Sequence, residues 1–166
     1  MSKKSRLSIV VALTAFLTIL FALVFPAVYL ESSSFQENNI TYIFGFTSTF
    51  GGVIIPSTGV ICPLAFNWGA FLAIVFILLG AGLVVIFDRQ ISSYALMLIL
   101  SLVSLVLFLL AEKLVNDTNG VISGFTTYLN TGFGTYVSIG FCSLSVIECA
   151  IGMYLIKADS STKRRR

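Results

Sequence analysis

The sequence contains no histidine, and only 10% of its 166 residues are charged, whereas 57% are hydrophobic. A soluble globular domain carries about 25% charged and about 45–50% apolar residues. So few charges cannot cover a surface that faces water, and so many apolar residues exclude an intrinsically disordered chain. The composition therefore indicates an integral membrane protein.

The lack of histidine also limits the chemistry that the chain can carry, because the usual base near neutral pH is missing. The three cysteines, Cys62, Cys142 and Cys149, are scattered, which excludes most zinc and iron–sulfur frameworks. The sequence has no P-loop, no G-x-S-x-G and no H-E-x-x-H motif. We therefore expect no enzyme, and no catalytic, cofactor-binding or metal-binding residues.

Four segments are long and apolar enough to cross a membrane, since a bilayer core about 30 Å thick needs about 20 apolar helical residues. Lipid cannot satisfy an open backbone, so we expect these segments to be helical. The fold class that this predicts is an all-α membrane protein, with residues 1–166 forming a single four-helix transmembrane domain. Pro26 falls near the outer end of the first span, where we expect it to kink the helix. The predicted spans are residues 7–30, 69–87, 94–111 and 136–156.

The orientation follows from the basic residues near the span ends, which favour the cytoplasmic side. Of the ten lysines and arginines, only Lys113 falls on the side opposite to the other nine. Both termini are therefore expected to be cytoplasmic. The first apolar run is longer than a signal-peptide core and lacks an A-x-A site, so we expect no cleavage. The basic residues 163–166 either only determine topology or also bind anionic lipid.

The two predicted outer loops, residues 31–68 and 112–135, are unusually rich in β-branched and aromatic residues. Gly and Pro interrupt these residues in the first loop, a pattern typical of short strands joined by turns. We expect a small β-prone extracellular cap, which is either structural, a surface for a partner or for self-association, or a substrate-binding loop. The second loop opens with a predicted turn at 116–120. Asn39 and Asn116 each begin an N-glycosylation sequon.

Small residues repeat along one face of the first and last spans, and in lipid such faces mark close helix contacts. In the last span their spacing alternates between four and three residues, as in a heptad seam. Ordinary helix packing explains this pattern, and the alternative is a pore lined by hydroxyls and thiols. We expect the first and last spans to touch along this small-residue seam, which consists of Ala12, Ala15, Ala22, Ser138, Cys142, Ser145, Cys149 and Gly152.

Glu148 is the candidate functional residue, because a charge inside a membrane costs several kcal/mol unless it is protonated, paired or hydrated. Measured along the helix axis, it lies about 12 Å from the inner end of the last span. Measured around the axis, it lies about 80° from the centre of the small-residue seam. No lysine, arginine or histidine lies in any span. Glu148 is therefore a hydrogen-bonded structural acid, a contact with a second membrane protein, or an ion or proton site. The candidate hydrogen-bond partners are Thr14, Thr18, Ser101 and Ser104.

Four spans, inside termini and a β-prone first outer loop resemble the layout of claudin-like tetraspan proteins. The resemblance is topological, because that family has a Gly-Leu-Trp segment and a cysteine pair in its first loop. Here Trp68 begins the second span and Cys62 is alone in its loop, so no residue role is carried over and no intramolecular disulfide is expected. The segments at 44–52 and 65–67 look similar to those of small uncharacterised bacterial membrane proteins.

The function expected from these features is that of a non-enzymatic membrane protein, acting as an accessory, assembly or structural subunit through helix and outer-loop contacts. The alternative is a transport or channel component that uses Glu148. The expected location is the cell membrane. The expected partners are the lipid bilayer and either further copies of the chain or a larger membrane-protein complex, and no nucleic acid.

Overall fold

A computed structural model describes residues 3–34, 37–54, 62–88, 90–119 and 129–163. Four helices dominate the fold, and each is long and apolar enough to cross a membrane. They are α1 (Lys3–Val24), α3 (Trp68–Ile86), α4 (Ile91–Leu109) and α6 (Phe133–Lys163). The remaining elements are β1 (Pro26–Ser34), β2 (Glu37–Phe44), α2 (Gly45–Phe50), β3 (Gly52–Ile54), β4 (Cys62–Leu64), α5 (Ala111–Asn119) and β5 (Leu129–Thr131).

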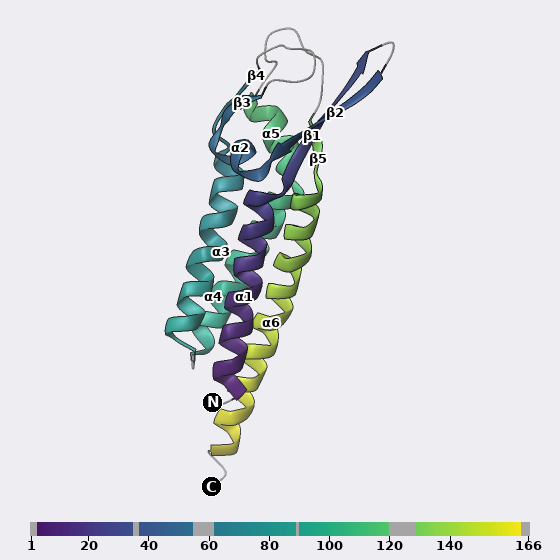
Figure 1. The fold of residues 1–166 in the computed structure, drawn as a ribbon. Helices are drawn as coiled ribbons and strands as arrows, with labels where there is room; N and C mark the ends of the chain where they lie inside the picture. Colours follow the sequence, from purple (N-terminus) through teal and green to yellow (C-terminus); the bar gives the residue numbers. More distant parts are fainter. Residues whose placement is uncertain (1–2, 35–36, 55–61, 89, 120–128, 164–166) are drawn as a thin grey trace.

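The four long helices form a closed bundle, in which α1 packs against α3, α3 against α4, α4 against α6, and α6 against α1. Successive helices alternate in direction, so every pair of neighbours is antiparallel. Figure 1 shows both described ends of the chain at one end of the bundle and the strands at the other. The predicted four-helix bundle is thus confirmed, as is the small sheet region beyond one end of it.

The first span is shorter than its predicted range of 7–30, because α1 ends at Val24 and Pro26 begins β1. Proline cannot donate the helical hydrogen bond, and it disfavours helical backbone in the residue before it. The predicted kink at Pro26 is therefore wrong, since the helix stops there. The apolar residues 26–30 continue as a strand because apolarity alone does not distinguish a strand from a helix.

The cap contains a three-stranded antiparallel sheet in the order β2-β1-β5 and a two-stranded sheet of β3 and β4. Residues 45–50, which lie within the loop expected to form strands, instead form the short helix α2. Gly45 begins α2 directly against the end of α1, where a Cβ atom would collide with the backbone of Ala22. The Gly45 N–H also donates to the carbonyl oxygen of Phe25 at 3.0 Å. This close approach attaches the cap to the first helix.

The segment predicted as the second outer loop also differs from the prediction, because its turn-like residues up to Asn119 belong to helix α5. One face of α5 is buried in the protein through Ala111 and Val115, while Glu112 and Asp117 on the helix are exposed. The side chain of Asn116 binds β5 to this helix. It donates to the carbonyl oxygen of Leu129 and accepts from the Leu129 N–H. These tertiary hydrogen bonds outweigh the local preference of Asn and Asp for turns.

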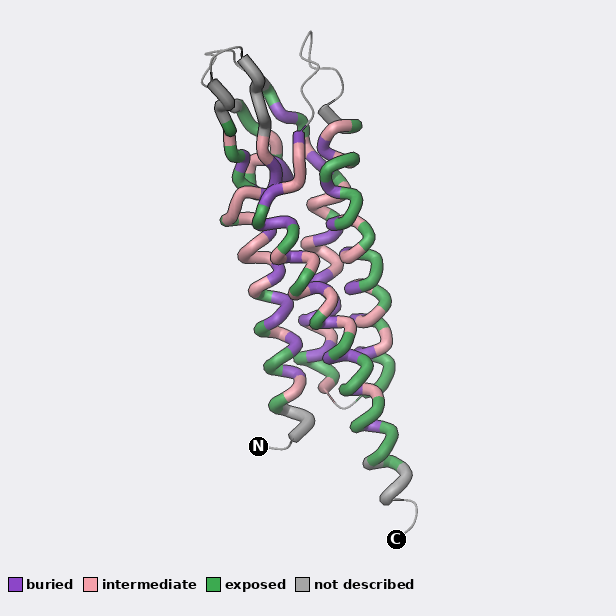
Figure 2. Tube along the Cα trace, turned by 90° about the vertical axis from the view of Figure 1, so that its right-hand side faces the viewer, coloured by how far each residue is buried: buried purple, intermediate pink, exposed green. Residues whose placement is uncertain are grey.

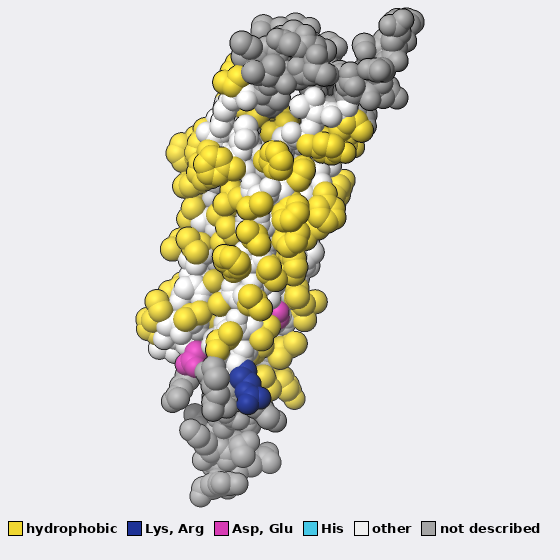
Figure 3. Space-filling view, in the orientation of Figure 1, with side chains coloured by type: hydrophobic (Ala, Val, Ile, Leu, Met, Phe, Trp, Pro, Cys, Tyr) yellow, Lys and Arg dark blue, Asp and Glu magenta, His cyan; other side chains and the backbone are white. Residues whose placement is uncertain are grey.

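The outside of the bundle is apolar, unlike the surface of a soluble protein, and its interior combines an apolar core with buried hydroxyl groups. Large apolar side chains such as Leu13, Phe16 and Leu78 are exposed, whereas the interior contains buried serines and threonines. Figure 2 shows the buried positions along the inner faces of the helices, and Figure 3 shows hydrophobic side chains over the visible face of the bundle. An apolar surface of this extent is typical of contact with lipid.

Candidate functional site

A line of hydroxyl groups joins α1 to α6 inside the bundle. The Ser138 hydroxyl donates to the carbonyl oxygens of Thr18 (3.1 Å) and Gly134 (2.8 Å). The Thr18 hydroxyl in turn donates to the carbonyl oxygen of Thr14, one helical turn earlier on α1, at 2.9 Å. Buried hydroxyls can thus satisfy their hydrogen bonds through backbone carbonyls, and the bond from Ser138 to Thr18 links the two helices.

Glu148 lies at the end of this line, on the flank of α6 that faces α1. Its side chain is only 7% exposed, and its Oε1 atom accepts a 2.9 Å hydrogen bond from the Thr14 hydroxyl. Its second oxygen, Oε2, is buried and has no hydrogen-bond partner in the described part of the chain. Of the four predicted partners, the structure selects Thr14.

Two further buried hydroxyls, those of Ser101 on α4 and Ser145 on α6, have no hydrogen-bond partner among the described residues. Ser145 precedes Glu148 by three residues, so the two lie on neighbouring positions of the same helical surface. Ser101 is connected to α6 because its carbonyl oxygen accepts from the Cys142 thiol at 3.1 Å. The bundle interior therefore contains hydrogen-bonding capacity that its own described residues do not use.

The small-residue seam of α6 is buried over its full length, from Ser138 to Gly152. Its contacts are shared between two helices, because Ser138 bonds α1 whereas Cys142 bonds α4. Gly152 also faces α4, since a Cβ atom there would collide with the ring of Tyr94.

On α1, the seam positions Ala15 and Ala22 are buried, but Ala12 is only half-buried. Ala22 packs with Ala73 of α3 and Phe108 of α4 rather than with the cysteines of α6. The two helices also meet through the rings of Phe21 and Phe141, whose centroids are 5.6 Å apart. The α1–α6 contact thus combines small residues with hydroxyls and aromatic rings.

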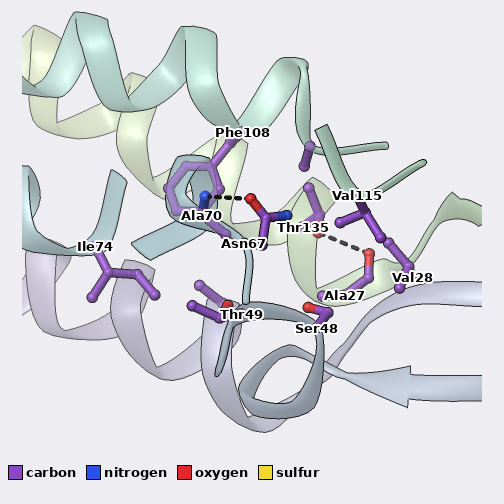
Figure 4. A pocket seen from close by; sticks show the side chains of 12 residues that line it. Ala27, Val28, Ser48, Thr49, Asn67, Ala70, Ile74, Phe108, Val115 and Thr135 are labelled. Atoms are coloured by element: carbon purple, nitrogen blue, oxygen red, sulfur yellow. Dashed lines mark hydrogen bonds between the residues drawn. The ribbon is translucent and has the colours of Figure 1, made fainter. Parts of the chain in front are cut away.

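The four long helices and the cap meet around a cavity of about 20 Å³, drawn in Figure 4. Asn67, which caps the N-terminus of α3, is 1% exposed and lines this cavity. Its Oδ1 atom accepts from the Ala70 N–H at 3.1 Å, and its own N–H donates to the Thr49 carbonyl at 2.9 Å. Its amide nitrogen Nδ2 has no hydrogen-bond partner within the ranges that the structure describes. Asn67 was not among the predicted site residues, although asparagine before a long apolar run is a typical N-cap.

The β1–β2 hairpin exposes an apolar face beyond the helix ends, and Figure 1 shows the hairpin reaching away from the bundle. Ile40, Tyr42 and Phe44 alternate along β2 and are 48%, 59% and 55% exposed, whereas Ile43 on the opposite face is buried. Tyr42 stands opposite Tyr29 of β1, with the ring centroids 6.4 Å apart. We call Ile40, Tyr42 and Phe44 the β2 face.

The two edges of the three-stranded sheet differ. At the β5 edge, backbone N–H groups are bonded by side chains of α5, Leu129 by Asn116 and Thr131 by Glu112. No hydrogen bond joins β2 to any segment other than β1 among the residues with described positions. One edge is therefore covered, and the other, beside the β2 face, has no further strand paired with it among the described residues.

An aromatic cluster lies where α2 and the chain entering α3 meet the end of the bundle that carries the strands. Its rings contact one another with centroids 4.7 to 6.1 Å apart. Trp68, the first residue of α3, is 66% exposed. Such aromatic residues are enriched at the ends of membrane spans. The members are Phe46, Phe50, Phe66, Trp68 and Phe71.

Other predicted features are described only in part. Cys142 and Cys149 are buried free thiols. The side chains of Cys62 and Asn39, and residues 164–166, lie outside the described positions, so the predictions about them stay predictions. No protein-family model matches the chain, and a search of curated proteins finds no significant match.

Proposed function

We propose that this protein is a non-enzymatic integral membrane protein, with both termini cytoplasmic, that serves as an accessory or assembly subunit by binding another protein through its outer cap. The observation that carries this proposal is the combination of the β2 face with the open edge of β2. Exposed apolar strands with unpaired edges are a liability unless something covers them. A partner that adds a strand to β2 gains both backbone hydrogen bonds and apolar contacts.

The membrane location is supported by the four apolar helices and by the aromatic cluster at their outer ends. The β2 face begins at this boundary, because Phe44 pairs with Pro26 just beyond the end of α1. Tyr42 and Ile40 are progressively farther along the hairpin. This position supports a binding surface beside the outer leaflet, where a neighbouring membrane protein can reach it.

The test is recovery of the complex from native membranes without detergent, followed by native mass measurement. Wild type is expected to carry a stoichiometric polypeptide partner, and Tyr42→Ser is expected to lose it while remaining folded. The matched control is Phe16→Ser, which removes an exposed aromatic ring from the lipid-facing surface of α1 and is expected to retain the partner. Recovery of the monomer alone from wild type would contradict the proposal.

A second candidate function, transport of ions or protons, is supported by the Oε2 atom of Glu148 and the hydroxyls of Ser101 and Ser145, which have no hydrogen-bond partner among the described residues. An intramembrane acid with free hydrogen-bonding capacity is typical of ion and proton pathways. Flux measurements on reconstituted protein test this function directly. Glu148→Gln is expected to abolish flux with the fold retained, and an absence of flux from wild type would exclude the transport function.

A further inference from the structure

We infer that the cavity between cap and bundle is a binding site for one water molecule, held by the amide nitrogen of Asn67. The cavity is walled by parts of α1, β1, α2, α3, α4, α5 and α6. All the membrane helices therefore meet the cap at this point. A ligand bound here contacts both parts of the molecule at once.

The size of the cavity selects the ligand. A water molecule needs about 10–15 Å³ of volume measured in this way, whereas small-molecule pockets have about 300–1,000 Å³. The cavity volume of about 20 Å³ admits one water and excludes a lipid chain or an organic ligand.

The chemistry of the walls also matches water. Asn67 Nδ2 is a buried donor without an acceptor in the described chain, and leaving such a group unpaired is costly. Figure 4 shows this nitrogen turned toward the part of the cavity where Thr135 lies. The Thr135 hydroxyl donates to the Ala27 carbonyl, and the Ser48 hydroxyl donates to the Gly45 carbonyl. Both hydroxyl oxygens keep lone pairs that can accept.

A water molecule thus accepts from Asn67 and donates to the hydroxyl oxygens of Thr135 or Ser48, which gives it the two to four polar partners that buried waters have. Asn67 belongs to the start of α3, Thr135 to α6 and Ser48 to α2. The water therefore adds a connection between the cap and the bundle beside the direct bond from the Thr135 hydroxyl to the Ala27 carbonyl. This role is independent of the proposed function of the β2 face.

The first test is a structure of the full chain, crystallised from a lipid phase at a resolution that shows ordered waters. The expected result is one density peak within about 2.7–3.2 Å of Asn67 Nδ2 and of at least one of the two hydroxyl oxygens. An empty cavity, or an Nδ2 atom bonded to a protein carbonyl, would overturn the inference.

The second test compares Ala70→Thr with Ala70→Val, two substitutions of equal size at a residue that lines the cavity beside Asn67. Both side chains are expected to displace the water, but only threonine supplies an oxygen that accepts from Asn67 Nδ2. The threonine variant is expected to unfold at a higher temperature or detergent fraction than the valine variant. Equal stabilities, or a more stable valine variant, would show that the cavity is a dry void and would overturn the inference even with both variants folded.

Discussion

Removing the hydroxyl that bonds Glu148 probes the polar interior of the bundle most sharply. Thr14→Val keeps the size of the side chain but removes the 2.9 Å hydrogen bond to Oε1. Because Oε2 has no partner within the described residues, the carboxyl group then keeps no hydrogen bond to the described part of the chain. Leaving a buried polar group unsatisfied costs about 1–3 kcal/mol, and we expect the free energy of unfolding to fall by that amount.

Two substitutions of Glu148 differ in whether they leave a hydrogen-bond acceptor for the Thr14 hydroxyl. Glu148→Gln keeps an acceptor for Thr14 and is expected to change the free energy of unfolding little. Glu148→Leu leaves the Thr14 hydroxyl free, but a threonine in a helix can turn to the carbonyl four residues earlier. We therefore expect Glu148→Leu to cost about 1 kcal/mol, at the low end of the range for an unsatisfied group.

A double-mutant cycle isolates the bond itself. Hydrogen bonds between membrane helices couple by about 0.6 kcal/mol on average and by at most about 1.7 kcal/mol, so we expect Thr14→Val and Glu148→Leu to couple within that range. The measurement is reversible unfolding in bicelles or mixed micelles. The control is Ser143→Ala, whose hydroxyl donates to Ile139 on its own helix, and it is expected to be additive with Glu148→Leu. A Thr14–Glu148 coupling below about 0.3 kcal/mol, which is the scatter of additive pairs, would refute the bond.

Three more predictions concern packing, the cap and topology. Gly152→Leu forces a side chain into the ring of Tyr94, and it is expected to lower the free energy of unfolding by about 1–3 kcal/mol or more in the same assay. The control Leu155→Ile, at a position that is 37% exposed, is expected to lower it by under about 1.5 kcal/mol. Equal costs would contradict the α4–α6 contact. Asn116→Ala removes both hydrogen bonds to Leu129, so amide exchange in β5 is expected to accelerate while exchange in the bundle stays unchanged, and unchanged exchange in β5 would count against these bonds. A membrane-impermeant thiol reagent is expected to label Cys62 in intact cells and a C-terminal reporter to be cytoplasmic, and an extracellular reporter would reverse the proposed orientation.

The helix bundle could be predicted from the sequence because span length and apolarity are set by the bilayer rather than by the rest of the chain. The ends of the long helices next to the strands were predicted less well. The apolar residues 26–30 fit a helix or a strand equally, and only Pro26 indicated where the helix stops. The Asn-Asp-Thr-Asn run at 116–119 favours a turn locally, but contacts with β5 keep it helical.

The polar features divide in the same way. Glu148 stood out because a single charge in an apolar span is visible without any structure, and its bond to Thr14 was among the alternatives that helix geometry allowed. The cavity at Asn67 was not predicted, because its walls come from segments spread from α1 to α6. In the sequence, the β2 face could be recognised only as part of an apolar loop. Its exposure depends on the sheet order, which places β2 at one edge, and on α5, which covers the β5 edge instead.

The proposed role of the β2 face is tested most directly by placing a photo-activated phenylalanine analogue at Tyr42 and irradiating the native membrane. The account predicts one discrete crosslinked polypeptide at Tyr42, and none from the same analogue at Tyr154, an exposed residue of α6 near the opposite end of the bundle. No protein adduct at Tyr42, or the same adducts from both positions, would contradict the assignment of this face to a partner.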